Sequence, residues 1–342
     1  MQNRIIWIDY VKSFGIFLMV LCHAKLNCDM MVTAIYTFHM PLFFFLSGYF
    51  DKGEGITRGN VIKSLKTLII PYFFFSICSF TICWISPYLH PEIYQRDSWL
   101  EIFKSAFLGM LIMEDKVTDY SFMPCGPLWF LCALFLVKIF YQIFFSLYRR
   151  IKVLSVLFVI ILCLVYNYHP NCFSVDSAIL AMPLYGLGIC FSKYRIIDKV
   201  SNNNNIINIC IATVMFFYII VLGTKNGKVD MDGSDYGNNL YMFYFNALIG
   251  IIMCILFART LPTNIKFLSK CGQATISILG THFYFLIPIQ VLLVLFLDMP
   301  MGVVPVLFSF LMALISCVGG VIIHNLLQKY LPWAIGKQSV KR

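Results

Sequence analysis

The chain has 342 residues, of which 60% are hydrophobic and only 12% are charged, and its mean hydropathy is +0.81. Since about a quarter of the residues of a typical soluble domain are charged, this composition excludes a soluble protein and predicts an all-α polytopic membrane protein. The net charge of +10 does not indicate nucleic-acid binding, because the basic residues gather in the loops on one side of the predicted membrane.

Ten apolar segments are long enough to cross a membrane as helices. We expect them at residues 5–24, 32–50, 64–86, 127–147, 152–168, 177–192, 206–223, 239–258, 273–297 and 303–328. The sixth segment is short and contains Pro183 and two glycines, which predicts a kink or an entry only partway into the membrane. The whole chain, residues 1–342, is therefore predicted to be a single integral-membrane domain.

Lysine and arginine residues in alternate loops predict the orientation. With the N-terminus in the cytoplasm, the cytoplasmic segments hold about three times as many basic residues as the outer segments, as the positive-inside rule requires. Both termini are expected in the cytoplasm, and the chain in the inner (plasma) membrane.

Two outer loops are long. They cover about residues 87–126, with an amphipathic segment at Trp99–Met113, and residues 224–238.

The first apolar segment carries ionisable side chains, Asp9, Lys12 and His23. Because buried charge is costly in hydrocarbon, these groups should face protein or a water-filled cavity. On a helix, Asp9 and Lys12 share a face, while Lys12 and His23 differ by roughly 20° in direction and lie about 16 Å apart along the axis. This stripe is typical of a site that reaches partway through a bilayer.

Each member of the stripe has a functional and a structural interpretation. His23, expected in the outer half of the membrane, is either a general base for a hydroxyl group or an interfacial histidine bonded to a neighbour. Lys12, expected near the cytoplasm, either binds a phosphate group or forms an ion pair with Asp9. We expect Asp9 to orient Lys12.

The later segments add further candidates. His39 lies two residues before Pro41, so it either pairs with His23 or fills the gap that the proline leaves in the backbone hydrogen bonding. Ser47 precedes a glycine that permits close approach of a ligand or of another helix. Lys138 should face the protein interior. For His282, structural and functional roles are equally open.

The sequence contains no recognisable metal or nucleotide motif. Its intramembrane histidines have no i, i+4 pair, its cysteines no CxxC spacing, and the chain has no GxSxG, Walker or GxGxxG pattern. We therefore expect no metal cofactor, and any nucleotide-bearing substrate to be held by a pocket within the membrane domain.

Several motifs occur in a fixed order along the chain. The N-terminal pair is the most specific, with Asp9 three residues before Lys12, ten residues between Lys12 and His23, and then the run Phe38–Tyr49. The later motifs are Gly126–Leu131, Pro183–Gly188, Asn226–Met231, Tyr236–Asn238 and Gly272–His282. Together they resemble the acyltransferase 3 family, and in particular its fucose 4-O-acetylase-like branch. The family pattern has arginine where Lys12 stands, and lysine occurs there in this branch.

The resemblance implies transfer of an acetyl group from cytoplasmic acetyl-CoA to a hydroxyl of a cell-surface glycan or its lipid-linked precursor. It implies that His23 is catalytic and that Lys12 lies on the coenzyme A side. With it we assign the remaining candidates, which are His39 and Asp9 as support for these two, Ser47 and Lys138 on the donor side, and Trp129, Asp230, Asp232, Asp235, Tyr236 and Asn238 on the acceptor side.

Two other functions fit the buried charges. One is a transporter or flippase for a small anion or a lipid-linked sugar. Against it, the sequence shows no inverted repeat of the kind that marks many transporters. The other is a non-catalytic assembly or sensor protein, for which His23 and Lys12 would be dispensable. The sequence leaves open the acceptor sugar, the acyl chain, the oligomeric state, and whether an acetyl-histidine forms or the hydroxyl attacks the donor directly.

Overall fold

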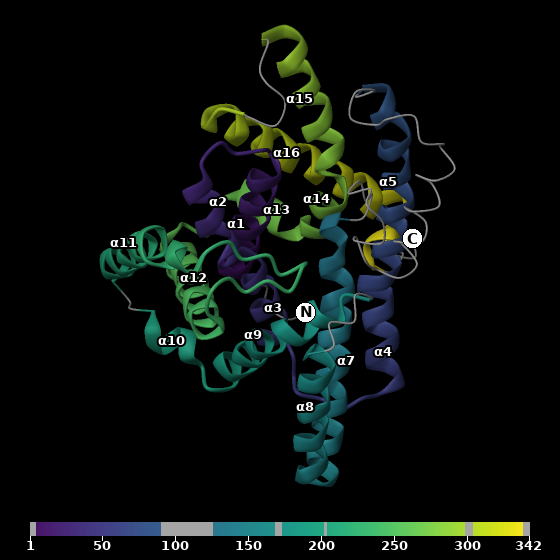
Figure 1. Ribbon diagram of the computed structural model, residues 1–342, viewed down its shortest axis with the longest axis vertical. Coiled ribbons are helices and arrows are strands. Elements are labelled where there is room, and N and C mark those ends of the chain that lie inside the picture. Colours follow the sequence, from purple (N-terminus) through teal and green to yellow (C-terminus); the bar gives the residue numbers. More distant parts are fainter. Residues whose placement is uncertain (1–4, 90–125, 168–172, 202–203, 298–303, 338–342) are drawn as a thin grey trace. The chain divides into compact units, whose positions relative to one another are not determined.

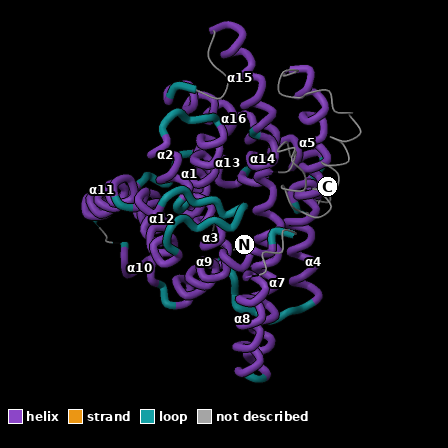
Figure 2. Tube along the Cα trace, viewed as in Figure 1, coloured by secondary structure: helices purple, strands orange, loops and turns teal. Residues whose placement is uncertain are grey.

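The computed structural model describes residues 5–89, 126–167, 173–201, 204–297 and 304–337. These residues form helices joined by loops and contain no strand (Figure 2). The chain divides into two compact units. Unit 1 comprises Met1–Lys52 and Ala181–Ile323, and unit 2 comprises Gly53–Leu180 and His324–Arg342.

Each unit has its own set of helices. Figure 1 labels the helices along the chain. Those of unit 1 are α1 (Ile6–His23), α2 (Asp29–Tyr36), α3 (His39–Tyr49), α10 (Ile196–Val200), α11 (Asn205–Val221), the short 3₁₀ helix η3 (Gly223–Asn226), α12 (Leu240–Thr260), α13 (Lys266–Gln273), α14 (Thr275–Thr281) and α15 (Phe283–Leu297). Those of unit 2 are α4 (Arg58–Ser64), the π-helical turn η1 (Leu65–Ile69), α5 (Ile70–Leu89), η2 (Gly126–Leu128), α7 (Trp129–Arg150), α8 (Lys152–Asn167) and η4 (Pro332–Ile335). Two helices, α9 (Val175–Lys193) and α16 (Val306–Tyr330), continue from one unit into the other.

The helices confirm an all-α polytopic membrane protein. In the part of the chain that the structure describes, eight helical stretches are long and apolar enough to cross a membrane, and a ninth is formed if α14 and α15 together make one bent span. The fifth predicted segment forms α8, a shorter apolar helix. The sixth forms α9, which is one continuous helix of 19 residues although Pro183 lies inside it. Each of the ten predicted segments thus corresponds to a helix or a helix pair.

The second predicted segment, 32–50, forms two helices instead of one. The chain leaves the helical path after α2, where the Thr37 hydroxyl donates to the carbonyl of Ala34 at 2.7 Å, and helical structure resumes at His39. Pro41 therefore lies in the first turn of α3, where a missing N–H costs no helical hydrogen bond. His39 does fill a gap in the backbone hydrogen bonding, because its Nδ1 lies 2.9 Å from the carbonyl oxygen of Ile35, but this gap lies before Pro41 and is not made by the proline.

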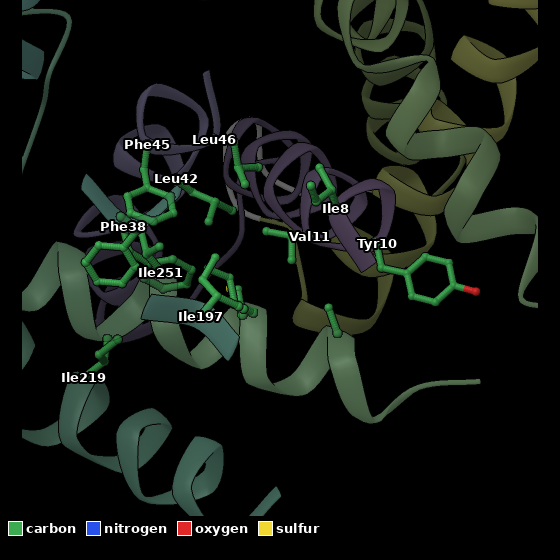
Figure 3. Packing of buried hydrophobic residues seen from close by; sticks show 14 of the residues in the cluster. Ile8, Tyr10, Val11, Phe38, Leu42, Phe45, Leu46, Ile197, Ile219 and Ile251 are labelled. Carbon is green, nitrogen blue, oxygen red and sulfur yellow. The ribbon is translucent and has the colours of Figure 1, made fainter. Parts of the chain in front are cut away.

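Helix α1 is central to unit 1 and packs against α3, α12, α13 and α14. Figure 3 shows the buried side chains of α1 and α3 meeting those of α12, with Val11, Leu42 and Ile251 fully enclosed. In a membrane, where lipid is as apolar as these side chains, close packing holds helices together in place of the hydrophobic effect. The Tyr10 hydroxyl adds a polar tie, since it donates to the carbonyl of Pro262 at 2.8 Å.

Two glycines let helices of unit 1 approach at backbone contact. A Cβ atom at Gly272 in α13 would overlap the carbonyl group of Asp9 in α1. A Cβ atom at Gly48 in α3 would overlap the carbonyl of Tyr185 in α9. The first contact sets α13 and α14 alongside α1. The second shows that the glycine after Ser47 serves helix packing.

Unit 2 is built on α4, η1, α5 and α7, which contact one another. The Thr57 hydroxyl caps α4 by accepting from the N–H of Asn60 at 3.2 Å. The C-terminal turn η4 packs on α5, where the rings of Trp333 and Phe74 lie 5.6 Å apart. The predicted amphipathic segment Trp99–Met113 in the first long outer loop lies outside the described residues.

Candidate active site

The polar stripe of α1 faces neighbouring helices in unit 1. Asp9 is 9% exposed, and Lys12 is half-buried with its Nζ 5.6 Å from the ring centroid of Phe50, which follows α3. His23 is the last residue of α1 and also half-buried. Helical periodicity places Lys12 and His23 on one face of α1, about 16 Å apart along its axis. Both side chains contact protein groups, as the cost of burying charge in lipid requires.

The His23 ring lies against the break between α14 and α15. Its centroid is 5.2 Å from the centroid of the His282 ring and 5.4 Å from that of Phe283. The chain just beyond α1 is held by α16, where the Ser309 hydroxyl lies 3.3 Å from the carbonyl of Ala24. The end of α1 is thereby held both by the ring contacts of His23 and by the bond from α16 to Ala24.

His282 is fully buried and is the residue between the two helices of the bent pair α14–α15. Its Nδ1 lies 2.9 Å from the carbonyl oxygen of Leu279 and 3.2 Å from that of Ile278. Since both partners are acceptors, Nδ1 must carry the proton and donate it. Its Nε2 then presents only a lone pair, and this atom has no hydrogen-bond partner among the residues that the structure describes.

His39 uses its ring in a similar way at the break between α2 and α3. It is 4% exposed, and its Nδ1 lies 2.9 Å from the carbonyl oxygen of Ile35, which again fixes the proton on Nδ1. Its ring meets the edge of the Tyr36 ring at 5.0 Å between centroids. His39, His282 and the exposed Lys25 are all close enough to act electrostatically on His23.

The second of the two long loops that are predicted on the outer side is organised by a buried amide. Asn226, 1% exposed, donates from its side chain to the carbonyl of Tyr236 at 2.7 Å and accepts from the N–H of Asn239 at 2.9 Å. Asp230 and Asp235 exchange a pair of backbone hydrogen bonds of 2.8 Å. The loop thus folds back on itself as a small hairpin, in which its side chains hold defined positions.

Two carboxylates of this loop lie near Tyr36, a neighbour of His39. The carboxylates of Asp230 and Asp232 act electrostatically on the Tyr36 hydroxyl, as does the thiol of Cys22. Tyr36 in turn contacts His39. Ring contacts and electrostatic interactions therefore link side chains from α1, α2, α3, the bent pair and this loop within unit 1. We call this set the histidine cluster: His23, Tyr36, His39, Asp230, Asp232 and His282.

The chain matches a known protein family. Residues 5–325 match the family described as an acyltransferase domain, acyltransferase 3. The chain belongs to the acyltransferase 3 family. No curated protein and no solved structure matches it. The family match covers nearly the whole chain and includes every residue of the histidine cluster, so the resemblance inferred from the N-terminal motifs is confirmed at the level of the family.

In this acyltransferase 3 protein, not all of the candidate residues lie in unit 1. Trp129 and Lys138 belong to α7 in unit 2, where Trp129 is 9% exposed and Lys138 is half-buried. Their assignments to acceptor and donor binding stay predictions. In unit 1, Tyr236 is half-buried and Asn238 is exposed, with the Asn238 side chain 3.5 Å from the carbonyl of Lys225.

The C-terminal end of α3 in this acyltransferase 3 protein carries a pair that the sequence analysis missed. The hydroxyl of Tyr185, a fully buried residue of α9, donates to the carboxylate of Asp51 at 2.5 Å. Ser47 is half-buried one turn earlier in α3. The ion pair predicted between Asp9 and Lys12 and the donor-side role of Ser47 stay predictions.

The sequence contained a signal for some of the missed residues. Asn226 precedes a glycine, a pair typical of turns, which could have marked it as the loop organiser. Tyr36 and the Tyr185–Asp51 pair carry no such local signal, because tertiary packing creates their contacts. Among the residues that the structure describes, no group of three or more histidine, cysteine, aspartate or glutamate side chains is arranged to hold a metal ion.

Proposed function

We propose that this membrane acyltransferase transfers an acetyl group from acetyl-CoA, bound from the cytoplasm, to a hydroxyl of a cell-surface glycan or its lipid-linked precursor. The observation that carries the proposal is the position of His23, on the same face of α1 as Lys12 and inside a cluster with two further histidines. In this proposal the protein lies in the inner membrane and resembles the fucose 4-O-acetylase-like branch of its family.

The donor side is proposed at the inner end of α1. Lys12 lies there, and an ammonium group on a flexible stem suits a phosphate of coenzyme A. An extended pantetheine arm is long enough to cover the roughly 16 Å of helix between Lys12 and His23, which would bring the thioester to the histidine cluster. Asp9, Ser47 and Lys138 are proposed to support the donor.

At His23 the chemistry is general base catalysis. An imidazole nitrogen with a free lone pair can take the proton of an alcohol as its oxygen attacks the thioester carbon. The same lone pair can instead attack the thioester and form an acetyl-histidine. Both routes end in the ester of the acceptor and the free thiol of coenzyme A.

The acceptor side is proposed at the outer loop, with Asp230 and Asp232 as hydrogen-bond acceptors for sugar hydroxyls. We expect the double substitution Asp230→Asn and Asp232→Asn to raise the KM for the acceptor about 10- to 100-fold, because the asparagine oxygens still accept hydrogen bonds but lose the charge that makes such bonds roughly twice as strong. The turnover at saturating acceptor should change little. Initial rates at varied acceptor concentration measure both constants.

Asp235 supplies the matched control for this charge change in the same loop. Its Oδ1 accepts from the N–H of Gly237 at 2.8 Å, so its side chain stabilises the hairpin. We therefore propose only Asp230 and Asp232 for acceptor binding. Because an asparagine oxygen can accept the same bond, Asp235→Asn should leave the KM for the acceptor unchanged. An unchanged KM in the double variant would contradict the acceptor site.

The function itself is tested with membranes that contain the protein and acetyl-CoA labelled in the acetyl group. Supplied with envelope glycan from cells that lack the protein, they should release free coenzyme A and label the glycan. Mass spectrometry of that glycan should show the added mass of one acetyl group. A transporter, a flippase or an assembly protein would release no coenzyme A and leave the glycan unlabelled, and that result would overturn the proposal.

A further inference from the structure

One buried polar atom of the histidine cluster, Nε2 of His282, is left incompletely bonded by the described residues. The residue is fully buried at a helix break, and Nε2 has no hydrogen-bond partner within the described ranges of the chain. An unpaired buried acceptor costs about 1–3 kcal/mol, so its presence calls for a partner that another state of the protein supplies.

The proton arrangement of His282 is set by the backbone. Two carbonyl groups at the end of α14, those of Ile278 and Leu279, accept from Nδ1. The opposite tautomer would set the lone pair of Nδ1 against both carbonyl oxygens and leave them without that donor. His282 is therefore held as a pure acceptor at Nε2, and the only imidazole in ring contact with it within the described chain is that of His23.

We propose that His282 is a positioning residue, whose Nε2 accepts a hydrogen bond from one ring N–H of His23 during the reaction. The proposal rests on the proposed function of His23. The two ring centroids lie 5.2 Å apart with a 46° angle between the planes, so rotation of the half-buried His23 ring brings its N–H toward Nε2. A base whose tautomer is fixed by a neighbour is the arrangement that the third member of a Ser-His-Asp triad provides.

The consequence is that the other ring nitrogen of His23 keeps its lone pair for the reaction. In direct transfer this nitrogen takes the proton of the acceptor hydroxyl while the oxygen attacks the thioester carbon. The carbon–sulfur bond then breaks, and the proton passes to the departing sulfur, which gives the acetyl ester and free coenzyme A. If an acetyl-histidine forms instead, the same lone pair attacks the thioester, so both routes need the fixed tautomer.

Two substitutions separate the functions of the two ring nitrogens of His282. His282→Asn retains a donor near the position of Nδ1, which can still cap the carbonyls of α14, but leaves no acceptor near the position of Nε2. His282→Gln places an amide oxygen near the position of Nε2 but removes the cap. We expect His282→Asn to lower kcat about 10- to 100-fold, because the tautomer of the His23 ring is then no longer fixed. Its KM for acetyl-CoA and its unfolding temperature should stay near those of the unaltered protein.

His282→Gln should retain more kcat than His282→Asn while unfolding at a lower temperature. Thr281→Val is the control for α14, because it removes the neighbouring buried bond from the Thr281 hydroxyl to the Ser277 carbonyl, 2.7 Å long, without touching His23. It should lower the unfolding temperature and leave kcat within about twofold.

All variants are assayed for release of coenzyme A beside the unaltered protein. If the unaltered protein itself releases none, the proposed function fails. If it is active and His282→Asn keeps its full kcat, or if kcat follows the unfolding temperature through all three variants, the positioning role of His282 is overturned and the proposed function stands.

Discussion

Replacing His23 with alanine is expected to lower the turnover of acetyl-CoA by a factor of about 100 to 10,000, the range that a positioned general base contributes. The side chain is half-buried beside His282 and Phe283, at the last residue of α1. Truncation should therefore leave the protein folded. The KM for acetyl-CoA should change little, because we assign donor binding to the inner end of α1. Release of coenzyme A against donor concentration measures both effects.

His324→Ala is the matched control for His23→Ala. His324 is a buried histidine near the end of α16, with its Nε2 3.2 Å from Nζ of Lys337 within unit 2, and it has no part in the proposed reaction. The two variants make the same change of residue type, and the control should keep its turnover. Full turnover in a folded His23→Ala protein would remove His23 from the mechanism.

The helices were predictable because lipid admits few alternatives. A chain inside a bilayer must satisfy its backbone groups within each segment, so apolar length alone predicts a helix. The stripe on α1 was predictable for the same reason, since helical periodicity fixes which of Lys12 and His23 share a face. Both inferences use information local to one segment.

The two breaks were not predictable from apolar length. The segment 32–50 reads as one span, and Pro41 suggests a kink within it, yet the helix is interrupted at Thr37 and resumes before the proline. In the ninth segment the break falls at His282, although Pro288 is the residue that pattern alone would select. Packing against α1 and its neighbours, which involves residues distant in sequence, accompanies both breaks.

The breaks also explain why two histidines of the cluster, His39 and His282, use their rings in the same way. A helix that ends inside a membrane leaves carbonyl groups that need donors. At both breaks an imidazole Nδ1 supplies the donor, His39 to Ile35 and His282 to Leu279. Each bond fixes a tautomer and leaves Nε2 as the acceptor. At His282 the bond that satisfies the backbone thus also leaves a lone pair on a ring that contacts His23.

Lys12→Ala is expected to raise the KM for acetyl-CoA about 10- to 100-fold, because the loss of one hydrogen bond between charged groups costs about 1.5–3 kcal/mol. The kcat at saturating donor should stay within about threefold, since His23 lies some 16 Å farther along α1. Lys12→Arg should bind acetyl-CoA at least as well, because a guanidinium keeps the charge, adds a bidentate fork for phosphate and can also lie over the Phe50 ring.

A truncated donor distinguishes phosphate binding from a general effect on the fold. Acetyl-pantetheine keeps the thioester and lacks the nucleotide and its phosphates. If Lys12 binds a phosphate of coenzyme A, Lys12→Ala and the unaltered protein should use this donor equally well, while only the unaltered protein should favour acetyl-CoA strongly over it. Lys12→Met, which keeps an apolar stem without the charge, should behave like the alanine variant. An equal loss with both donors would show that Lys12 supports α1 itself, through a partner such as Asp9, and takes no part in binding the donor.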